Sequence, residues 1–518
     1  MSERFIGLDL GQKSKHQVAV LDGMELRGKP FAITVTQAGV EQLLRRATEG
    51  TTDRVTFVME PTGMAWLPMA ARVSAAGHRV YLTKPQKQSD LRKFYRRHTK
   101  TDVIDAVTAG RLPQVDPSGA HELILPTAAQ MSLRYDVRLR ARYAVEVTKH
   151  KRRIHSLLQV ANPGLMEALG EHRFTKGCMR LLREHVDPSK VATGGVSILN
   201  KIFERAMTKR DEIVKRVHQA CIDAHALYEP LRTSGRMPID LVHHQELVND
   251  ELDDIDRLEQ RIAKLTSRIE AQYLVIDPER TLTQLRGIGV TIAATIEATV
   301  GDVKRFRNAK AFASYCGLVP RRKKSGETDP AMPITKAGQR LLKQNLYLAA
   351  DVARHWDPEF AAYYARRFKR GDHHTHIVVA LAHKMANRVF ALLKRRSLAP
   401  EGQVAGATAA EVRYILRDPD GNEVTKLEAR EIIQRKYARA IVDPQRVARE
   451  RLRKTGEAPA ATKMSGCHFD TTALSARAST DGLTNLAVPK AIDDVLKTLL
   501  KRCGHDSGDV PQTPLEST

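Results

Sequence analysis

Apolar and polar residues follow two different patterns along this chain, and the change of pattern divides it into regions. In the first 125 residues, short apolar runs at 4–8, 16–21 and 55–59 are separated by polar turns, which is typical of β-strands. The first two runs are close enough to pair as a β-hairpin. Pro61 prevents a helix from forming at the residue before it, so Glu60 is predicted to be extended at the carboxyl end of a strand.

From about residue 127 the pattern becomes helical. Residues 127–160 are charged and largely free of Gly and Pro, which predicts one long basic helix. Residues 239–271 predict a second helix, in which the apolar positions alternate in steps of three and four: Ile255, Leu258, Ile262, Leu265 and Ile269. Such a heptad seam serves either a helical hairpin within one chain or association between protomers. The sequence leaves both alternatives open.

A third pattern begins after Pro278. Residues 282–291 look like the turn of a helix-hairpin-helix, in which Gly287 and Gly289 would let backbone amides meet a phosphate. Residues 335–340 open a further helix that carries Arg340 and Lys343. Beyond residue 400, two short apolar runs flank Asp418-Pro419-Asp420-Gly421-Asn422, which predicts a β-hairpin with an Asp-Gly turn.

These patterns predict an α/β plus all-α fold with four regions. They are a mixed-sheet domain at 1–125, a helical and coiled-coil assembly region at 126–275, a small mainly helical domain at 276–398, and an extension of unknown role at 399–518. The end of the extension, from about residue 504, is polar and is predicted to be disordered. We find no signal-peptide pattern and no apolar stretch near membrane-spanning length, so a soluble cytoplasmic protein is expected. Five cysteines without metal-site spacing are predicted to be free thiols.

The charge balance narrows the choice of partner. The 84 Lys and Arg residues outnumber the 60 Asp and Glu residues, which leaves a formal charge of +24 and favours a polyanion. Some of the excess precedes a pair of acids and is interleaved with Phe94 and Tyr95: Lys84, Lys87, Arg92, Lys93, Arg96, Arg97 and Lys100. This run either guides phosphates towards the acids or is a solvated basic helix face.

Four carboxylates are the candidate metal ligands. Asp9 ends the first apolar run, Glu60 ends the third, and Asp102 and Asp105 lie three residues apart, on one face of a helix that Thr101 would cap. A single Asp at a strand end is usually a turn residue. Four acids together, with no His or Cys, suit Mg²⁺ or Mn²⁺, and two such ions roughly 4 Å apart support phosphoryl transfer.

Ser325 is the candidate nucleophile. It follows the cations Arg321, Arg322, Lys323 and Lys324, which would hold a phosphate, and Gly326 would allow a close approach of the backbone. A Ser-Gly pair in a loop is more often only a turn, so the residues alone leave this role open. Two groups rich in histidine, Asp372 to His376 and Cys467-His468, are interpreted as polar surface and not as metal sites.

The order of these motifs resembles the IS110-type transposases, a family of DEDD recombinases that includes the IS1111 branch. The resemblance covers residues 1 to about 120 and about 275 to 395. The matching residues are Gly7 to Gly11, Met59 to Gly63, Lys100 to Ala106, Leu285 to Gly289, Phe306, Gly317 to Pro320, and Ser325-Gly326. Arg286 stands where the family commonly has Pro, and the region from 160 to 240 is long for the family.

The resemblance implies a RuvC-like, RNase H-type domain in which Asp9, Glu60, Asp102 and Asp105 hold Mg²⁺. It also implies a small C-terminal transposase domain whose Ser325 forms a 5′-phosphoserine linkage. A structured bridge RNA would select donor and target double-stranded DNA. The family builds composite sites from two protomers, so a homo-oligomer is expected, a tetramer built from dimers, in a prokaryotic cytoplasm in association with the nucleoid.

We therefore predict an RNA-guided, Mg²⁺-dependent transposase of an insertion sequence that exchanges DNA strands by serine transesterification. One alternative is a structure-specific endonuclease similar to junction resolvases, which would use the four acids and water and leave Ser325 idle. Another is a non-catalytic nucleic-acid-binding protein in which the acids only cap helices and pair with cations. Sugar-kinase-like ATP binding also begins with Asp-Leu-Gly on a strand, but no matching phosphate loop follows.

Overall fold

A computed structural model describes residues 3–11, 15–51, 55–61, 63–203, 210–321, 334–335, 337–398 and 414–438. The chain divides into two compact units, each described here by itself. Unit 1 comprises residues 1–127 together with 302–307, and unit 2 comprises residues 128–301 and 308–518. The end of unit 1 lies two residues from the predicted boundary at 125. The further division of unit 2 at 275 and 398 stays a prediction.

Unit 1 is built on a mixed sheet. Its described strands are ordered β3-β2-β1-β5-β6-β7, with β4 also paired to β2. β1 pairs with β5 and β5 with β6 in parallel, whereas the other pairs are antiparallel. The predicted hairpin of the first two apolar runs is confirmed by the antiparallel pair β1 and β2. The bounds are β1 (Arg4–Asp9), β2 (His16–Asp22), β3 (Glu25–Leu26), β4 (Phe31–Ile33), β5 (Thr56–Met59), β6 (Arg79–Thr83) and β7 (Ala120–Glu122).

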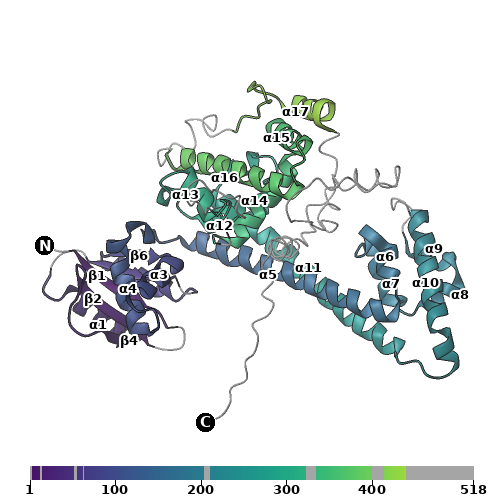
Figure 1. The fold of residues 1–518 in the computed structure, drawn as a ribbon, viewed down its shortest axis with the longest axis horizontal. Helices are drawn as coiled ribbons and strands as arrows, with labels where there is room; N and C mark the ends of the chain where they lie inside the picture. Colours follow the sequence, from purple (N-terminus) through teal and green to yellow (C-terminus); the bar gives the residue numbers. More distant parts are fainter. Residues whose placement is uncertain are drawn as a thin grey trace, which may run out of the picture. The chain divides into compact units, whose positions relative to one another are not determined.

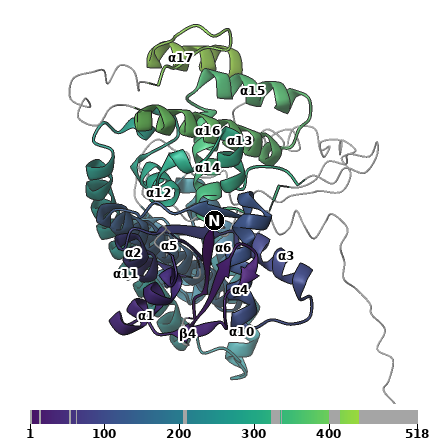
Figure 2. The same ribbon diagram turned by 90° about the vertical axis from the view of Figure 1, so that its left-hand side faces the viewer.

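Helices cover both faces of this sheet (Figure 2). Ile6 and Leu8 of β1 share a core with residues of α1 (Gln37–Thr48) and α2 (Trp66–Ala75). The alternate residue Phe5 packs instead with Ala109 of α4 (Asp102–Val115). The sheet therefore has one face towards α1 and α2 and another towards α4, against which α3 (Pro85–Tyr95) also packs. A 3₁₀ turn, Pro117–Gly119, leads from α4 to β7.

Unit 2 contains a long antiparallel helical hairpin made of α5 (Ala128–Ala161) and α11 (Leu241–Ile276). Arg268 bonds Asp136, and Arg140 donates to Thr266 Oγ1 at 2.9 Å, so residue numbers rise along one helix as they fall along the other. Figure 1 shows the two helices side by side. The apolar seam of α11 packs along α5 of the same chain, as the intramolecular alternative predicts, and association between protomers stays a prediction.

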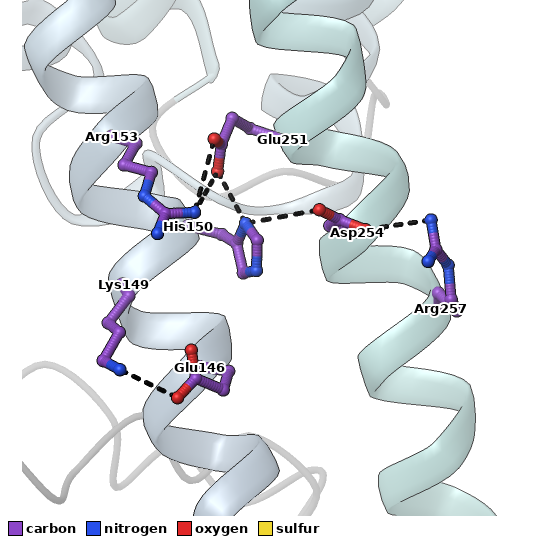
Figure 3. Close-up of polar contacts among 7 residues, drawn as sticks. All are labelled: Glu146, Lys149, His150, Arg153, Glu251, Asp254 and Arg257. Atoms are coloured by element: carbon purple, nitrogen blue, oxygen red, sulfur yellow. Dashed lines mark hydrogen bonds and ion pairs between the residues drawn. The ribbon is translucent and has the colours of Figure 1, made fainter.

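Polar contacts fix the register of this hairpin (Figure 3). His150 Nδ1 lies 2.5 Å from Glu251 Oε2 and 3.8 Å from Asp254 Oδ2. Arg153 Nη1 approaches the same Glu251 carboxylate at 3.5 Å, and Arg257 pairs with Asp254 at 2.9 Å. Three of these contacts join one helix to the other, so sliding one helix along the other would separate the paired groups.

A small helical subdomain covers the end of the hairpin where α5 ends and α11 begins. Its core joins Leu158 and Leu252 of the hairpin to Leu169, Leu181 and Val217 of the shorter helices. Their bounds are α6 (Leu165–Leu169), a 3₁₀ turn (Gly170–His172), α7 (Lys176–Glu184), α8 (Pro188–Gly194), α9 (Val196–Ile202) and α10 (Arg210–Thr233). Cys178 and Cys221 lie in this core and, like Cys316, are free and buried, as predicted. Cys467 and Cys503 lie outside the described residues.

The remaining helices pack around α16 (His374–Leu398), which contacts α13 (Ala309–Tyr315), α14 (Arg340–Ala353) and α15 (Pro358–Lys369). The expectation that no stretch approaches membrane-spanning length was wrong for α16. Among the described helices it alone is long and apolar enough to cross a membrane, but 56% of its apolar window is buried in the protein. Its apolarity is explained by its position in a protein core.

Ionic groups inside unit 2 connect α11, α12 (Val290–Val300) and α16. Asp277 and Glu297 are only 1% and 4% exposed. The guanidinium of Arg396 pairs with both, at 3.3 Å and 2.8 Å. Tyr273 also donates its hydroxyl to Asp277 Oδ2 at 2.7 Å, and the Thr281 hydroxyl donates to the other oxygen, Oδ1, at 2.8 Å.

The described part of the C-terminal extension, residues 414–438, folds against the α15 region. Tyr414 donates its hydroxyl to buried Asp357 at 2.9 Å and accepts a bond from Arg388 at 2.5 Å. A bridge between Arg417 and Glu423 closes the predicted Asp-Gly turn, and Asp418 accepts bonds from the amides of that turn. The segment α17 (Lys426–Ile432) and the π-helical turn Ile433–Tyr437 follow. Ile433 packs on Ala361 of α15.

Candidate functional site

The sheet of unit 1 brings two of the predicted acids to one edge. β1 and β5 are parallel neighbours with Leu8 opposite Met59, and Asp9 and Glu60 are the next residues of the two strands. Because side chains alternate along a strand, Asp9 belongs to the same face as Phe5, and Glu60 to the same face as Val58. Phe5 and Val58 both pack on α4. Asp9 and Glu60 therefore lie at the carboxyl edge of the sheet, on its α4 face.

Helix α4 supplies the other two acids. It begins at Asp102 because Thr101 caps it, with the Thr101 hydroxyl accepting from the amide of Ile104 at 3.3 Å, as predicted. Asp102 and Asp105 occupy its first turn. Negative charge is favoured there, because the helix dipole and the free amides make an N-terminus positive.

Two glycines let α4 lie directly on β1. A Cβ on Gly7 would lie 1.9 Å from the backbone oxygen of Ala106 and 2.6 Å from the backbone nitrogen of Gly110. A Cβ on Gly110 would lie 2.5 Å from Leu21 Cδ1. Any larger residue at position 7 would push α4, and with it Asp105, away from Asp9.

Gln88 is a positioning residue that the sequence analysis missed. It is 2% exposed, accepts a bond from the Thr83 hydroxyl at 2.6 Å, and donates to the backbone oxygen of Asp105 at 3.4 Å. It thus connects the end of β6 to the first turn of α4. A glutamine in a basic helix carries no pattern that would have revealed this role.

The charges of the four acids affect one another's ionisation. Burial, then the charges of Asp102, Asp105 and Glu60, raise the pKa of Asp9 to about 6 from its usual 3.8. Burial and the charge of Asp105 also raise the pKa of Glu60. Ionising all four acids at once is therefore unfavourable unless a cation compensates.

Two cations partly compensate this charge. Arg92 Nε lies 3.2 Å from Asp105 Oδ1, with both side chains largely buried. Burial raises the pKa of Asp105, while Arg92 and Lys100 oppose that rise. Lys100 also acts in this direction on Asp9 and Glu60. The site is thus a cluster of carboxylates already matched with positive charge.

The donor set fits a hard divalent cation. All four groups are carboxylates, and burial together with neighbouring carboxylates raises the pKa values of Asp9, Glu60 and Asp105, an effect that Mg²⁺ or Mn²⁺ would offset. In the described residues, no three acidic, His or Cys side chains are close enough together to form a coordination shell. The four side chains would therefore have to change their conformations in order to bind one ion together.

The basic run before α4 is mostly exposed but not all free. Lys87 pairs with Asp116 at 3.0 Å, Lys84 donates to the Ser118 carbonyl at 2.5 Å, and Arg92 pairs with Asp105. The remaining members are exposed in the described structure: Lys93, Arg96, Arg97 and Lys100. This second group is the better candidate for contact with phosphates.

The predicted helix-hairpin-helix turn stays a prediction, and the structure shows how the chain runs there. A four-residue 3₁₀ helix, Thr281–Gln284, precedes the turn, and Gly289 is the N-cap of α12. Gly287 has φ +86°, and a Cβ there would lie 2.0 Å from the backbone oxygen of Ala349 in α14. Gly287 therefore allows a close helix contact. Gly289 has open space around it and leaves the start of α12 accessible.

The serine region is described only at its margins. Ser325 and three of its preceding cations, Arg322, Lys323 and Lys324, lie outside the described residues. Arg321 and Arg340 are exposed at either side. Lys343 donates to the backbone oxygen of Thr335 at 2.8 Å, so it supports the chain that leads into α14.

The histidine cluster has a structural explanation. His374 Nδ1 lies 2.8 Å from the Tyr364 hydroxyl, and its Nε2 lies 3.7 Å from Asp351 Oδ1. His373 Nδ1 accepts a bond from the amide of Thr375. These contacts join α14, α15 and α16. Cys467-His468 lies outside the described residues.

Comparison with known proteins decides the family. Residues 6–163 match the family model DEDD_Tnp_IS110, described as "Transposase", and residues 279–365 match the model described as "Transposase IS116/IS110/IS902 family". The first match contains the four acids, and the second runs from the 3₁₀ turn before α12 into α15. The chain belongs to the IS110 family of transposases.

Two relatives align with this IS110-family protein over almost their whole length, and a third aligns over about a third of its length. The "Insertion element IS110 uncharacterized 43.6 kDa protein" of Streptomyces coelicolor is 25% identical over 409 residues, 78% of this chain and 98% of that protein. The "Insertion element IS116 uncharacterized 44.8 kDa protein" of Streptomyces clavuligerus is 22% identical over 76% of this chain and 95% of its own length. The "Transposase for insertion sequence element IS1111A" of Coxiella burnetii is 31% identical over 115 residues, 21% of this chain and 31% of that protein.

Proposed function

We propose that this IS110-family transposase moves its insertion sequence by Mg²⁺-dependent DNA strand exchange, with Asp9, Glu60, Asp102 and Asp105 as metal ligands and Ser325 as nucleophile. The observation that carries the proposal is the shared position of the four acids. They lie at two strand ends and one helix start on one face of the sheet, and burial, followed by the charges of the other three acids, raises the pKa of Asp9 to about 6. A structural role as caps and ion pairs does not require such mutual repulsion.

The chemistry that divalent ions supply is charge neutralisation on the transferring phosphate and activation of the attacking oxygen. The acids hold and orient those ions. Arg92 and Lys100, which offset the carboxylates in this structure, would then be free to meet the phosphate oxygens. Exposed Arg96 and Arg97 would extend that positive path along the DNA backbone.

With a serine nucleophile, strand exchange takes two transesterification steps. In the first, Ser325 Oγ forms a bond to phosphorus, its proton leaves to a base, and the bond to the 3′-oxygen breaks and that oxygen takes a proton. The 5′-phosphate is then linked to Ser325. In the second, the 3′-hydroxyl of the other strand attacks the phosphoserine, which restores the serine and joins the exchanged strands. The number of phosphodiester bonds is unchanged, so no external energy source is needed.

The proposal extends to partners. A structured bridge RNA would choose the donor and target DNA, and a tetramer built from dimers would hold two duplexes, in a prokaryotic cytoplasm near the nucleoid. The +24 charge of the chain favours such polyanionic partners. Among the alternatives, a resolvase-like nuclease differs from this proposal in its nucleophile, and a non-catalytic binding protein differs in needing no metal.

A strand-exchange assay with the full-length protein, element-end DNA, target DNA and RNA from the element's flank tests the function. We expect recombination from the native protein only with Mg²⁺ or Mn²⁺, and none from Asp9→Asn or Ser325→Ala. Asp90→Asn, a change in an exposed carboxylate of α3, is the matched control. Trapping of a DNA adduct on Ser325 would support the serine pathway. Cleavage without an adduct, with Ser325→Ala fully active, would favour the water-dependent nuclease.

A further inference from the structure

Phe94, in the last turn of α3, is 81% exposed. It is the most exposed large apolar side chain in the described part of the chain. Leaving an aromatic ring of this size in water forgoes much of the free energy that its burial would give. Such a ring therefore raises the question of what covers it during function.

The ring belongs to an ordered platform. Tyr95 packs edge-on against Phe94, with ring centroids 5.2 Å apart. The guanidinium of Arg111, from α4, lies over the Tyr95 ring at 5.2 Å, and its Nε donates to the backbone oxygen of Met24 at 3.2 Å. Tyr95 is thus held from behind by α4 and by the turn between β2 and β3, and it supports Phe94 at the surface.

The surroundings of the platform are cationic and close to the acids. Lys93, Arg96 and Arg97 are exposed beside Phe94 along the chain. Arg92, two residues before Phe94, reaches Asp105 at 3.2 Å. Two residues of a helix rise only about 3 Å along its axis, so Phe94 lies near the acid cluster while pointing to another side of α3.

We propose that Phe94 stacks on an unpaired base of the DNA strand that is cut at the acid cluster. An aromatic ring between cations fits this ligand, because cations hold the backbone phosphates while the ring covers the face of a base. Base faces are covered inside a duplex and become free when pairs open. Strand exchange requires such opening. The inference rests on the proposed function, since it takes the acids to be the site where DNA is cut.

A protein partner fits the surface less well. Its side chain would have to cover Phe94 while an acidic surface matched at least three neighbouring cations. A single DNA strand supplies both the flat apolar face and the negative charge in every nucleotide. A role in contact between protomers is kept as an outcome of the test.

Binding of fluorescein-labelled DNA to the full-length protein, measured by anisotropy in Ca²⁺ at several salt concentrations, tests the inference. The DNA duplexes contain either an unpaired bubble or full pairing. We expect Phe94→Ala to lose at least about fivefold in affinity for the bubble and much less for the paired duplex. The salt dependence should stay unchanged, because stacking releases no counterions. Phe94→Trp should restore binding, and Ile124→Ala, at an exposed apolar residue of the same unit, should bind as the native protein does.

A 2-aminopurine in the bubble reports stacking directly. Its fluorescence should fall when the native protein binds and should fall less with Phe94→Ala. Equal loss for both duplexes, unchanged binding by Phe94→Ala, or a larger loss for an RNA bubble than for DNA would overturn the inference. So would a change of oligomeric state in sedimentation velocity, which would assign Phe94 to contact between protomers.

The two proposals fail in different ways. If bubble binding needs Phe94 but the native protein does not exchange strands, the stacking is supported and the proposed function is contradicted. If Phe94→Ala exchanges strands and binds the bubble as well as the native protein does, the proposed function is supported and the stacking is contradicted. A native protein that binds neither duplex would overturn both.

Discussion

Gly7 of β1 lies directly beneath Ala106 of α4, so close that a Cβ on Gly7 would be 1.9 Å from the Ala106 backbone oxygen. This contact joins the strand that carries Asp9 to the helix that carries Asp105. The spacing of the acid cluster is therefore set by the packing of backbone on backbone, two residues before Asp9 and one residue after Asp105.

Gly7→Ala is expected to destabilise unit 1 and to weaken metal-dependent activity together. The added methyl group would force α4 off the sheet, and overpacking of this kind costs about 1–3 kcal/mol or more. Urea unfolding at neutral pH measures the loss of stability. Gly289→Ala, where a Cβ meets nothing within 4 Å, is the control and should change the unfolding free energy far less. Equal stability of native protein and Gly7→Ala would contradict the close contact.

Asp9→Asn is expected to stabilise the metal-free protein above pH 6. The folded-state pKa of Asp9 is raised to about 6 from 3.8, so the folded chain binds a proton more tightly than the unfolded chain does. Stability from this group is therefore present at low pH and is lost as pH rises from about 4 to about 6. After allowance for partial solvent screening, the gain near pH 8 should be about 1–2 kcal/mol.

Thermal unfolding of native protein and Asp9→Asn, at about pH 4 and about pH 8, measures this difference. The two should have similar midpoints at the lower pH and separate at the higher. Mg²⁺ should raise the midpoint of the native protein at the higher pH and have little effect on the variant, since protons and metal compete for the same oxygen atoms. If the variant were less stable than the native protein near pH 8, the ionised Asp9 carboxylate would stabilise the fold, and the expectation would be contradicted.

Arg396→Met should destabilise unit 2 by about 3 kcal/mol or more, because it leaves Asp277 and Glu297 buried without their cation. The penalty should shrink in acid, where the carboxylates take up protons. Denaturant unfolding at neutral and acidic pH checks both effects. Arg395→Met is a matched control, since Arg395 is the exposed neighbour on the same helix. Equal effects of the two substitutions would argue against the buried ion cluster.

Tyr414→Phe should loosen the attachment of residues 414–438 without unfolding the helices beneath. The variant loses the hydroxyl that donates to Asp357 and accepts from Arg388, at a cost of about 1–2 kcal/mol. Hydrogen exchange followed by mass spectrometry should show faster exchange in this segment and little change in α14. Tyr437→Phe, in the same segment, is the comparison. Exchange as slow as in the native protein would mean that other contacts hold the segment.

The parts of the fold with a local cause could be predicted from the sequence. The strand before Glu60 follows from an apolar run ended by Pro61, and the start of α4 follows from Thr101 and the apolar residues after it. Both were predicted at or near their observed positions. Neighbouring parallel strands then bring Asp9 and Glu60 to one edge, which is a general property of α/β sheets.

The contacts that cross the chain could not be predicted in this way. Gly7 acts through its contact with Ala106, 99 positions along the chain, and Gln88 acts through its bond to the backbone of Asp105, 17 positions along. Arg92 was expected to meet phosphate, and the sequence did not indicate that it also pairs with Asp105 in the protein alone. Gly287 was expected to approach a phosphate, and it packs on α14. In each case the residue type suggested close approach or charge, but only the tertiary structure names the partner.

The antiparallel hairpin of α5 and α11 has a consequence for how chains of this kind can differ in length. The connection between its two helices, residues 162–240, leaves and returns at the same end of the pair. Insertions or deletions there would leave the contacts between α5 and α11, such as the pair of Asp136 and Arg268, in register. The small helical subdomain can therefore vary in length between related chains, provided that other apolar residues still bury Leu158 and Leu252.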